Sequence, residues 1–142
     1  MQFKKPFKEK RLIFKNSKGE IMKYINSKDF FFKRFGEIYF NKTLKNKKKG
    51  WIFHKKNTCL ISPIVGRIFF HIINGDKLSL SFGKEYKFDI DSKQFEILVI
   101  PKKFWFSFYT KNNYAIFANL IEKPHSDKEV LKNTIIKNYR IA

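Results

Sequence analysis

Short apolar segments, each bounded by turn residues, follow one another along most of this chain of 142 residues. In GEIYFNKTL, the residues Glu37, Tyr39 and Asn41 alternate with Ile38 and Phe40, and alternation with period two is typical of a strand with two different faces. The chain has no βαβ alternation, no internal repeat and no glycine-rich phosphate loop, which excludes a Rossmann-type fold. The pattern therefore predicts an all-β sandwich or barrel.

Turn residues indicate how these strands connect. RLIFKNSKGEIMKYI predicts a hairpin that turns at residues 16–19, because Gly19 can adopt a positive φ. TCLISPIVGRIFFHII predicts two strands separated at residues 63–66, and QFEILVIP predicts a buried strand that ends at Pro101. GDKLSLSFGKEYKFDI and FWFSFYTKNNYAIFANLIE each predict a further hairpin, the second turning at residues 111–113.

Only the C-terminal segment HSDKEVLKNTIIKNYR has helical spacing. Ser126 followed three residues later by Glu129 matches a capping box, which predicts that a short helix begins there. We therefore expect a basic N-terminal arm over residues 1–10, a barrel over 11–131 and a helical tail over 132–142.

Composition narrows the class of protein. Hydrophobic residues make up 43% of the chain, which favours a globular fold over disorder. No apolar run approaches the roughly 20 residues that span a bilayer, and the basic N-terminus lacks the apolar segment of a secretory signal. The single cysteine, Cys59, cannot form an internal disulfide and is predicted to be buried, so we expect a cytoplasmic protein without a membrane partner.

The formal net charge of +19 allows two interpretations. A strongly basic protein often binds an anion such as nucleic acid, a membrane surface or a phosphorylated ligand. Alternatively, the abundance of Lys, Asn, Ile and Phe reflects AT-rich codons, since the lysines are spread over most of the chain rather than gathered in one stripe.

Six segments in a fixed order carry a family resemblance. They are NSKG (16–19), FGEIYF (35–40), KGWIFHKK (49–56), VGRIFF (65–70), IPKKFWFSF (100–108) and ANLIEKPHSDKEV (118–130). In this order the chain resembles the cupin family of nucleotide-sugar enzymes that includes dTDP-4-dehydrorhamnose 3,5-epimerases and dTDP-sugar 3,4-ketoisomerases. KGWIFHKK is similar to the Arg-Gly-x-His-x-His-Lys segment of the ketoisomerase branch. The resemblance implies a cupin jelly roll, here with a short C-terminal helix.

The resemblance also implies which catalytic positions have changed. The first His of the family segment, which is the base of the epimerases, falls at Ile52; the family lysine falls at Ser62, and the expected Tyr falls near Pro124 and His125. His54 matches the second His, the base of the ketoisomerase branch. Strand alternation places Ile52 and His54 on the same face, and a structural histidine at a strand end is the alternative interpretation.

Glu37 and Tyr39 complete the predicted catalytic group. They share one face of the strand before the lysine-rich turn, and we predict that Glu37 orients His54 while Tyr39 donates to a substrate oxygen. The opposite face, with Ile38 and Phe40, is then expected to pack against another sheet. In the alternative, Glu37 and Tyr39 are outward polar residues on a half-exposed strand.

The predicted substrate-binding residues are Lys49, Asn41, Trp105 and Asn119. Lys49 takes the family's Arg position and offers charge to a diphosphate, though without the bidentate fork of Arg. Trp105 is expected either to line the cavity or to pack in the core.

No metal and no cofactor is predicted, because the three histidines lack His-x-His spacing. The resemblance implies a nucleotide-sugar substrate and a homodimer. It further implies an isomerase or epimerase that removes a proton beside the ketone of a 4-keto-6-deoxy nucleotide sugar, in surface-polysaccharide biosynthesis.

Two alternatives remain. Ile52 and Ser62 suit a cupin that binds a nucleotide sugar or a partner without turnover. A basic β-barrel that binds single-stranded nucleic acid would explain the lysines and aromatic residues but not the order of the six segments, so a nucleic-acid partner is not expected.

Overall fold

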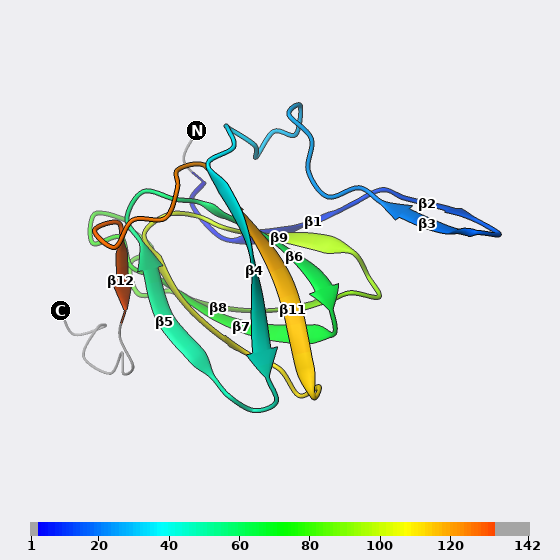
Figure 1. Ribbon diagram of the computed structural model, residues 1–142. Coiled ribbons are helices and arrows are strands. Elements are labelled where there is room, and N and C mark those ends of the chain that lie inside the picture. Colours follow the sequence, from blue (N-terminus) through cyan, green and yellow to red (C-terminus); the bar gives the residue numbers. More distant parts are fainter. Residues whose placement is uncertain (1–2, 133–142) are drawn as a thin grey trace.

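The computed structural model describes residues 3–132, and every regular element in them is a strand (Figure 1). The strands are β1 (Phe7–Lys10), β2 (Ile13–Asn16), β3 (Gly19–Met22), β4 (Glu37–Leu44), β5 (Lys49–His54), β6 (Cys59–Val65), β7 (Arg67–Asn74), β8 (Glu85–Asp91), β9 (Glu96–Ile100), β10 (Phe104–Tyr109), β11 (Tyr114–Ile121) and β12 (Val130–Lys132). The all-β prediction is confirmed. Within residues 3–132 there is no helix long and apolar enough to cross a membrane.

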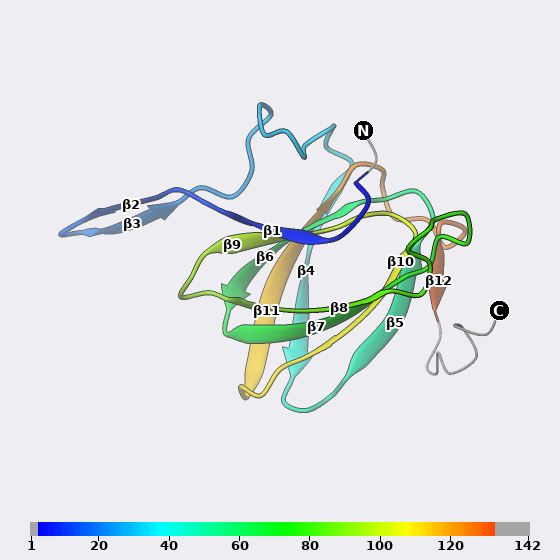
Figure 2. The same cartoon turned by 180° about the vertical axis from the view of Figure 1, so that it is seen from behind.

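Two five-stranded sheets form a sandwich. The first sheet has the order β1-β9-β6-β11-β4 and the second the order β12-β5-β10-β7-β8, with every paired strand antiparallel. The hairpin β2-β3 belongs to neither sheet and projects away from the sandwich (Figures 1 and 2). This architecture is the predicted jelly-roll sandwich.

Phenylalanine side chains dominate the space between the sheets. The rings of Phe70, Phe106, Phe108 and Phe117 lie 5.0 to 6.4 Å apart, centroid to centroid, within one buried cluster. The cluster draws alternate residues from each strand, as expected when one face of a strand is buried. The next residues along the strands face outward, and on the first sheet they form a second apolar cluster around Phe31.

Strands that are adjacent in sequence do not always pair. The hairpin at residues 16–19 is confirmed, but β10 and β11 lie in different sheets, so the turn at 111–113 crosses between sheets and the predicted hairpin is wrong. Likewise β6 and β7 separate at Gly66 into different sheets, and Pro63 lies within β6. Residues 75–84 form turns, and only β8 follows them, because the period-two pattern shows where a strand lies but not which sheet it joins.

Both ends of the described chain differ from prediction. Residues 7–10 form β1, which pairs with β9 and is not a loose arm. The capping pattern at Ser126 begins no helix: Glu129 N bonds Ser126 O at 3.0 Å in a turn, and β12 then pairs with β5. Residues 133–142, the rest of the predicted helical tail, lie outside the described residues.

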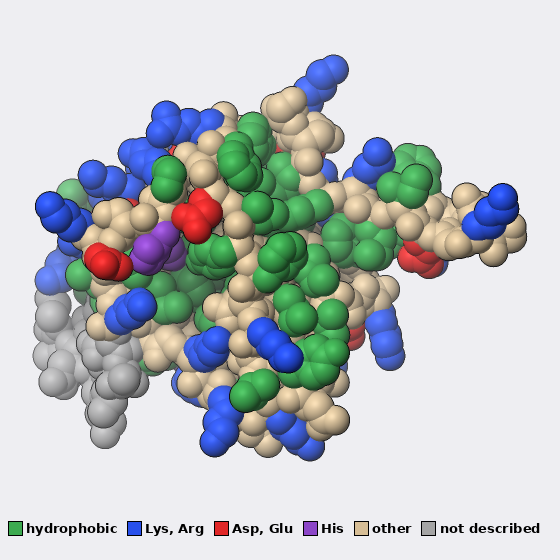
Figure 3. Space-filling view, viewed as in Figure 1, with side chains coloured by type: hydrophobic (Ala, Val, Ile, Leu, Met, Phe, Trp, Pro, Cys, Tyr) green, Lys and Arg blue, Asp and Glu red, His purple; other side chains and the backbone are tan. Residues whose placement is uncertain are grey.

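The strand β4 stands at the edge of the first sheet. Its outward residues Ile38 and Phe40 are 38% and 65% exposed, so the prediction that they pack against another sheet is wrong. Apolar side chains are visible at the surface on this side of the molecule, among scattered lysine and arginine side chains (Figure 3). The inward face of β4 carries the polar residues instead.

Gly36 allows the chain before β4 to lie directly against the end of β11. Its N–H donates to Ile121 O at 2.9 Å, and a Cβ added here would lie 2.4 to 2.5 Å from backbone atoms of Glu122 and Lys123. We expect Gly36→Ala to lower the free energy of unfolding by roughly 1–3 kcal/mol, because backbone must move to make room. Urea denaturation measures this, with the exposed neighbour Phe35→Ala as control. Equal effects of the two substitutions would contradict the close approach.

Candidate active site

His54 lies at the end of β5 with its side chain on the inner face of the second sheet. The side chain is only 5% exposed, and the imidazole lies nearly parallel to the Phe106 ring, 9° between planes at a centroid distance of 6.2 Å. Ile52 packs on the same inner cluster, whereas Phe53 faces outward against Trp105. The period-two prediction that Ile52 and His54 share a face is confirmed.

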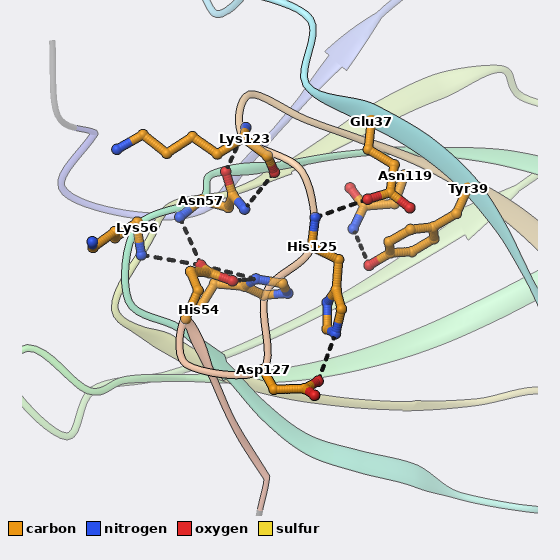
Figure 4. Close-up of polar contacts among 10 residues, drawn as sticks. Glu37, Tyr39, His54, Lys56, Asn57, Asn119, Lys123, His125 and Asp127 are labelled. Carbon is orange, nitrogen blue, oxygen red and sulfur yellow. Dashed lines mark hydrogen bonds and ion pairs between the residues drawn. The ribbon is translucent and has the colours of Figure 1, made fainter.

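A buried carboxylate holds the imidazole. His54 Nδ1 donates to Glu129 Oε2 at 2.9 Å, with Oε1 at 3.2 Å, and Glu129 Oε1 also accepts from the backbone N–H groups of Lys56 and Asn57 at 3.1 and 2.9 Å (Figure 4). Glu37, predicted to orient His54, instead accepts from His125 N at 2.8 Å. Glu129 therefore has the orienting role.

The His54–Glu129 contact sets the charge of the site. Burial by itself lowers the pKa of His54, but the neighbouring Cys59 and the Glu129 carboxylate raise it to about 9. The imidazole is therefore a cation at neutral pH and forms a buried ion pair with Glu129. Cys59 is fully buried, as predicted.

Polar side chains line the inner face of β4 and β11 opposite. Asn119 Nδ2 donates to Tyr39 Oη at 2.9 Å, so the predicted Asn119 and Tyr39 lie together. Burial raises the pKa of Tyr39, and nearby negative groups, Glu37 and Glu129 among them, raise it further, although the Asn119 bond lowers it; Tyr39 is neutral at physiological pH. Within residues 3–132, Asn119 Oδ1 and Thr43 Oγ1 are buried without a hydrogen-bond partner, as expected of groups that face a polar ligand or water.

The segment from residue 122 to residue 129 closes this end of the sandwich. Asn57 bonds Lys123 twice, donating from Nδ2 to O and accepting at Oδ1 from N, both at 3.0 Å. The Glu37 bond fixes the backbone at His125, whose Nε2 bonds Asp127 Oδ1 at 3.2 Å (Figure 4). His125, where the family's Tyr was expected, thus stands next to Glu37, with its side chain 43% exposed.

The other predicted binding residues separate into two groups. Lys49 Nζ donates to Asn41 Oδ1 at 2.9 Å and to Lys42 O at 3.1 Å, which joins the start of β5 to β4. Trp105 packs with Trp51 and Ile73 on the outer face of the second sheet, so the cavity-lining prediction is wrong and its packing alternative holds. Phe106, one residue on, is the aromatic side chain beside His54.

Sequence reasoning missed three residues of the site: Glu129, Asn57 and Asp127. The sequence pattern around Glu129 indicated a helix cap, which is a different role. No sequence pattern singled out Asn57 or Asp127. Among residues 3–132, no group of three His, Cys, Asp or Glu side chains lies close enough together to hold a metal ion.

The fold is the one found in solved structures of nucleotide-sugar isomerases and epimerases. The dTDP sugar isomerase of Desulfovibrio desulfuricans G20 superposes with a TM-score of 0.87 at 23% identity, covering 94% of this chain and 87% of that one. The dTDP-6-deoxy-D-glucose-3,5-epimerase of Legionella pneumophila, solved with dTDP-4-keto-L-rhamnose, superposes with a TM-score of 0.86 at 17% identity. The match covers 100% of this chain and 79% of that one. The dTDP-4-dehydrorhamnose 3,5-epimerase of Elizabethkingia anophelis NUHP1 superposes with a TM-score of 0.82 at 17% identity, covering 94% of this chain and 77% of that one.

No protein-family model and no curated protein sequence matches the chain. At these identities the similarity shows a shared fold. The fold that the six segments implied is therefore confirmed.

The raised pKa of His54 makes stability depend on pH. Because the folded pKa of about 9 lies above the ordinary 6.5, the ion pair stabilises the fold fully below pH 6.5, and this stability is lost as the pH rises through 9. We expect a loss of roughly 3 kcal/mol between pH 6 and pH 9.5 in urea denaturation. His54→Gln should give a flatter profile, and equal slopes in the two proteins would remove the ion pair as the cause.

Proposed function

We propose that this protein is an isomerase that acts on a 4-keto-6-deoxy sugar carried by a nucleoside diphosphate, moving a proton from the carbon beside the ketone to the adjacent ketone carbon. The observation that carries the proposal is the His54–Glu129 pair on the inner face of β5, with the polar inner face of β4 and β11 opposite. The fold shared with a dTDP sugar isomerase supports it.

The proposal gives each group a role that is consistent with its hydrogen bonds. Neutral His54 accepts the proton from the carbon beside the ketone, the C–H electron pair forms the enolate, and Glu129 stabilises the imidazolium that results. Tyr39 accepts its hydrogen bond from Asn119, so its own O–H is available to donate to the enolate oxygen. His54 then delivers the proton to the former ketone carbon, while the proton of the hydroxyl on the first carbon passes to the former ketone oxygen, so the ketone has moved by one carbon.

The proposed substrate extends from His54 toward the start of β5. Lys49, held by Asn41, is the proposed contact for the diphosphate, since its ammonium group is exposed and fixed at a defined place on the barrel rim. In the proposal the protein works in the cytoplasm, in surface-polysaccharide biosynthesis; a lone buried cysteine suits that compartment.

One observation favours a second candidate function, binding of a nucleotide sugar without turnover. His54 is almost fully buried between Phe106, Glu129 and Cys59, so a substrate reaches the ring only if the segment over it moves. A chain that had lost catalysis would keep such a histidine for packing alone.

Deuterium exchange separates these candidates. In D2O the protein should introduce deuterium beside the ketone of dTDP-4-keto-6-deoxyglucose, and His54→Asn should slow this by about 100-fold or more. Because the base must be neutral, kcat/KM should rise about tenfold per pH unit and level off near pH 9.

The exposed surface variant Lys93→Ala is the control. Exchange that survives His54→Asn would exclude His54 as the base. Saturable binding of the nucleotide sugar without exchange would establish the second candidate.

We further propose that the protein is a homodimer. The hairpin β2-β3 projects from the sandwich with Leu12, Phe14 and Ile21 more than half exposed, and an isolated two-stranded hairpin is marginally stable in water (Figure 2). A second copy of the chain, which offers the exposed β4 residue Phe40, is the partner we expect.

Light scattering should therefore give roughly twice the chain mass of 17.2 kDa. Phe14→Lys should shift the protein toward monomer by placing a charge in the apolar contact, whereas Lys15→Gln, on the opposite face of β2, should not. A wild-type monomer at micromolar concentration would contradict the dimer.

A further inference from the structure

A groove lies on the outer face of the second sheet. Ser107 on β10 stands in register with His71 on β7 and with Gly50 on β5, and its neighbours Phe106 and Phe108 point into the core. Gly50 has no side chain and the side chain of Ser107 is small. The surface of the sheet therefore lies lower here than at neighbouring positions, which carry larger side chains. The result is a cavity of about 280 Å³, hereafter the outer groove.

Aromatic rings line the outer groove. The rings of Phe69 and Tyr109 lie 5.2 Å apart with 19° between their planes, and both side chains are partly exposed. His71 also lines the groove, and its ring meets Trp51 edge to face at 5.0 Å. These walls suit a flat ring, because stacking on aromatic faces needs no particular hydrogen-bond pattern.

Cationic side chains surround these rings. Lys48 Nζ lies 5.3 Å from the centre of the Trp51 ring, and Arg67 and Lys111 lie 5.0 and 5.1 Å from the Phe69 ring. Lys87, on β8, lines the groove and is exposed. Within residues 3–132, neither Lys48 nor Lys87 forms an ion pair.

The two carboxylates near the outer groove already have partners. Asp89 accepts from Arg67 at 2.8 Å, and Glu85 bonds His71 Nε2 at 3.0 Å. The charge available to a ligand is therefore positive and comes from Lys48 and Lys87.

The floor of the outer groove carries an unsatisfied polar atom. Ser107 Oγ is buried and has no hydrogen-bond partner within residues 3–132. A buried hydroxyl without a partner costs stability, and a polar ring edge seated in the groove would remove that cost.

We propose that the outer groove binds a nucleotide. The base lies between the aromatic walls with a polar edge toward Ser107 Oγ, and the phosphate lies between Lys48 and Lys87. A volume of about 280 Å³ lies just below the roughly 300–1,000 Å³ of drug-sized ligand sites, which limits the ligand to one nucleotide. The groove lies on the opposite face of the sheet from His54, so this site is separate from the proposed active site. The nucleotide is either free or one unit of a single strand.

Amide NMR titration with thymidine monophosphate locates the site. We expect saturable shifts at Phe69, Lys87 and Ser107, and Lys87→Glu should weaken binding about tenfold or more by reversing a phosphate contact. The control Lys77→Glu changes the net charge equally on an exposed loop and should leave the affinity unchanged. His54→Asn should also leave these shifts in place, which separates this result from failure of the proposed enzyme activity.

A parallel titration with a short oligothymidylate identifies the source of the nucleotide. Tighter binding of the strand, with a salt dependence that Lys87→Glu reduces, indicates a single strand, and equal affinity indicates the free nucleotide. Shifts confined to Glu37, Tyr39 and His54, equal weakening by both lysine variants, or no binding of either probe would overturn the proposal.

Discussion

The Glu129 carboxylate is the group on which this end of the molecule depends. It is 6% exposed, and removing a charge from water is costly unless hydrogen bonds and an opposite charge replace the solvent. Here His54 provides the charge, and the backbone N–H groups of Lys56 and Asn57 provide the remaining bonds. One carboxylate thus ties the start of β12 to β5 and to the turn that leads into β6.

The second sheet separates two chemically different surfaces. On its inner face, phenylalanine rings fill most of the space between the sheets, and polar groups lie near β4 and β11 and at the His54–Glu129 pair. On its outer face, Gly50 and Ser107 produce a hollow among aromatic and lysine side chains. Two of the lysines that contribute to the net charge of +19, Lys48 and Lys87, therefore line a defined cavity, even though lysines occur all over the chain. Codon bias and local recruitment of a few lysines are compatible explanations.

Period two was sufficient to predict which residues share a face. It placed Ile52 with His54 and Glu37 with Tyr39, because the pleat of a strand fixes side-chain direction locally. It could not predict that β10 and β11 enter different sheets, since a turn of a few residues can reverse the chain within one sheet or between two. Trp105 was predicted to bind substrate for a related reason: in FWFSF every residue but one is aromatic, so the pattern offers no contrast between the two faces of the strand.

Glu129 shows most clearly what a local sequence pattern cannot predict. Ser-x-x-Glu predicts a helix start when only neighbouring residues are considered, and a helix would have used the carboxylate for its own first turn. In the fold, a partner 75 residues away takes the carboxylate instead, and a buried ion pair with two further hydrogen bonds outweighs a cap worth about 1 kcal/mol. The same contact limits the proposed chemistry. With Ile52 in place of a first histidine, His54 is the one base that the proposal has on this strand, and a single base returns a proton to the face from which it was taken. In the proposal, that geometry favours isomerisation between adjacent carbons over inversion, and the neutral fraction of His54, controlled by Glu129, is the quantity that sets the rate.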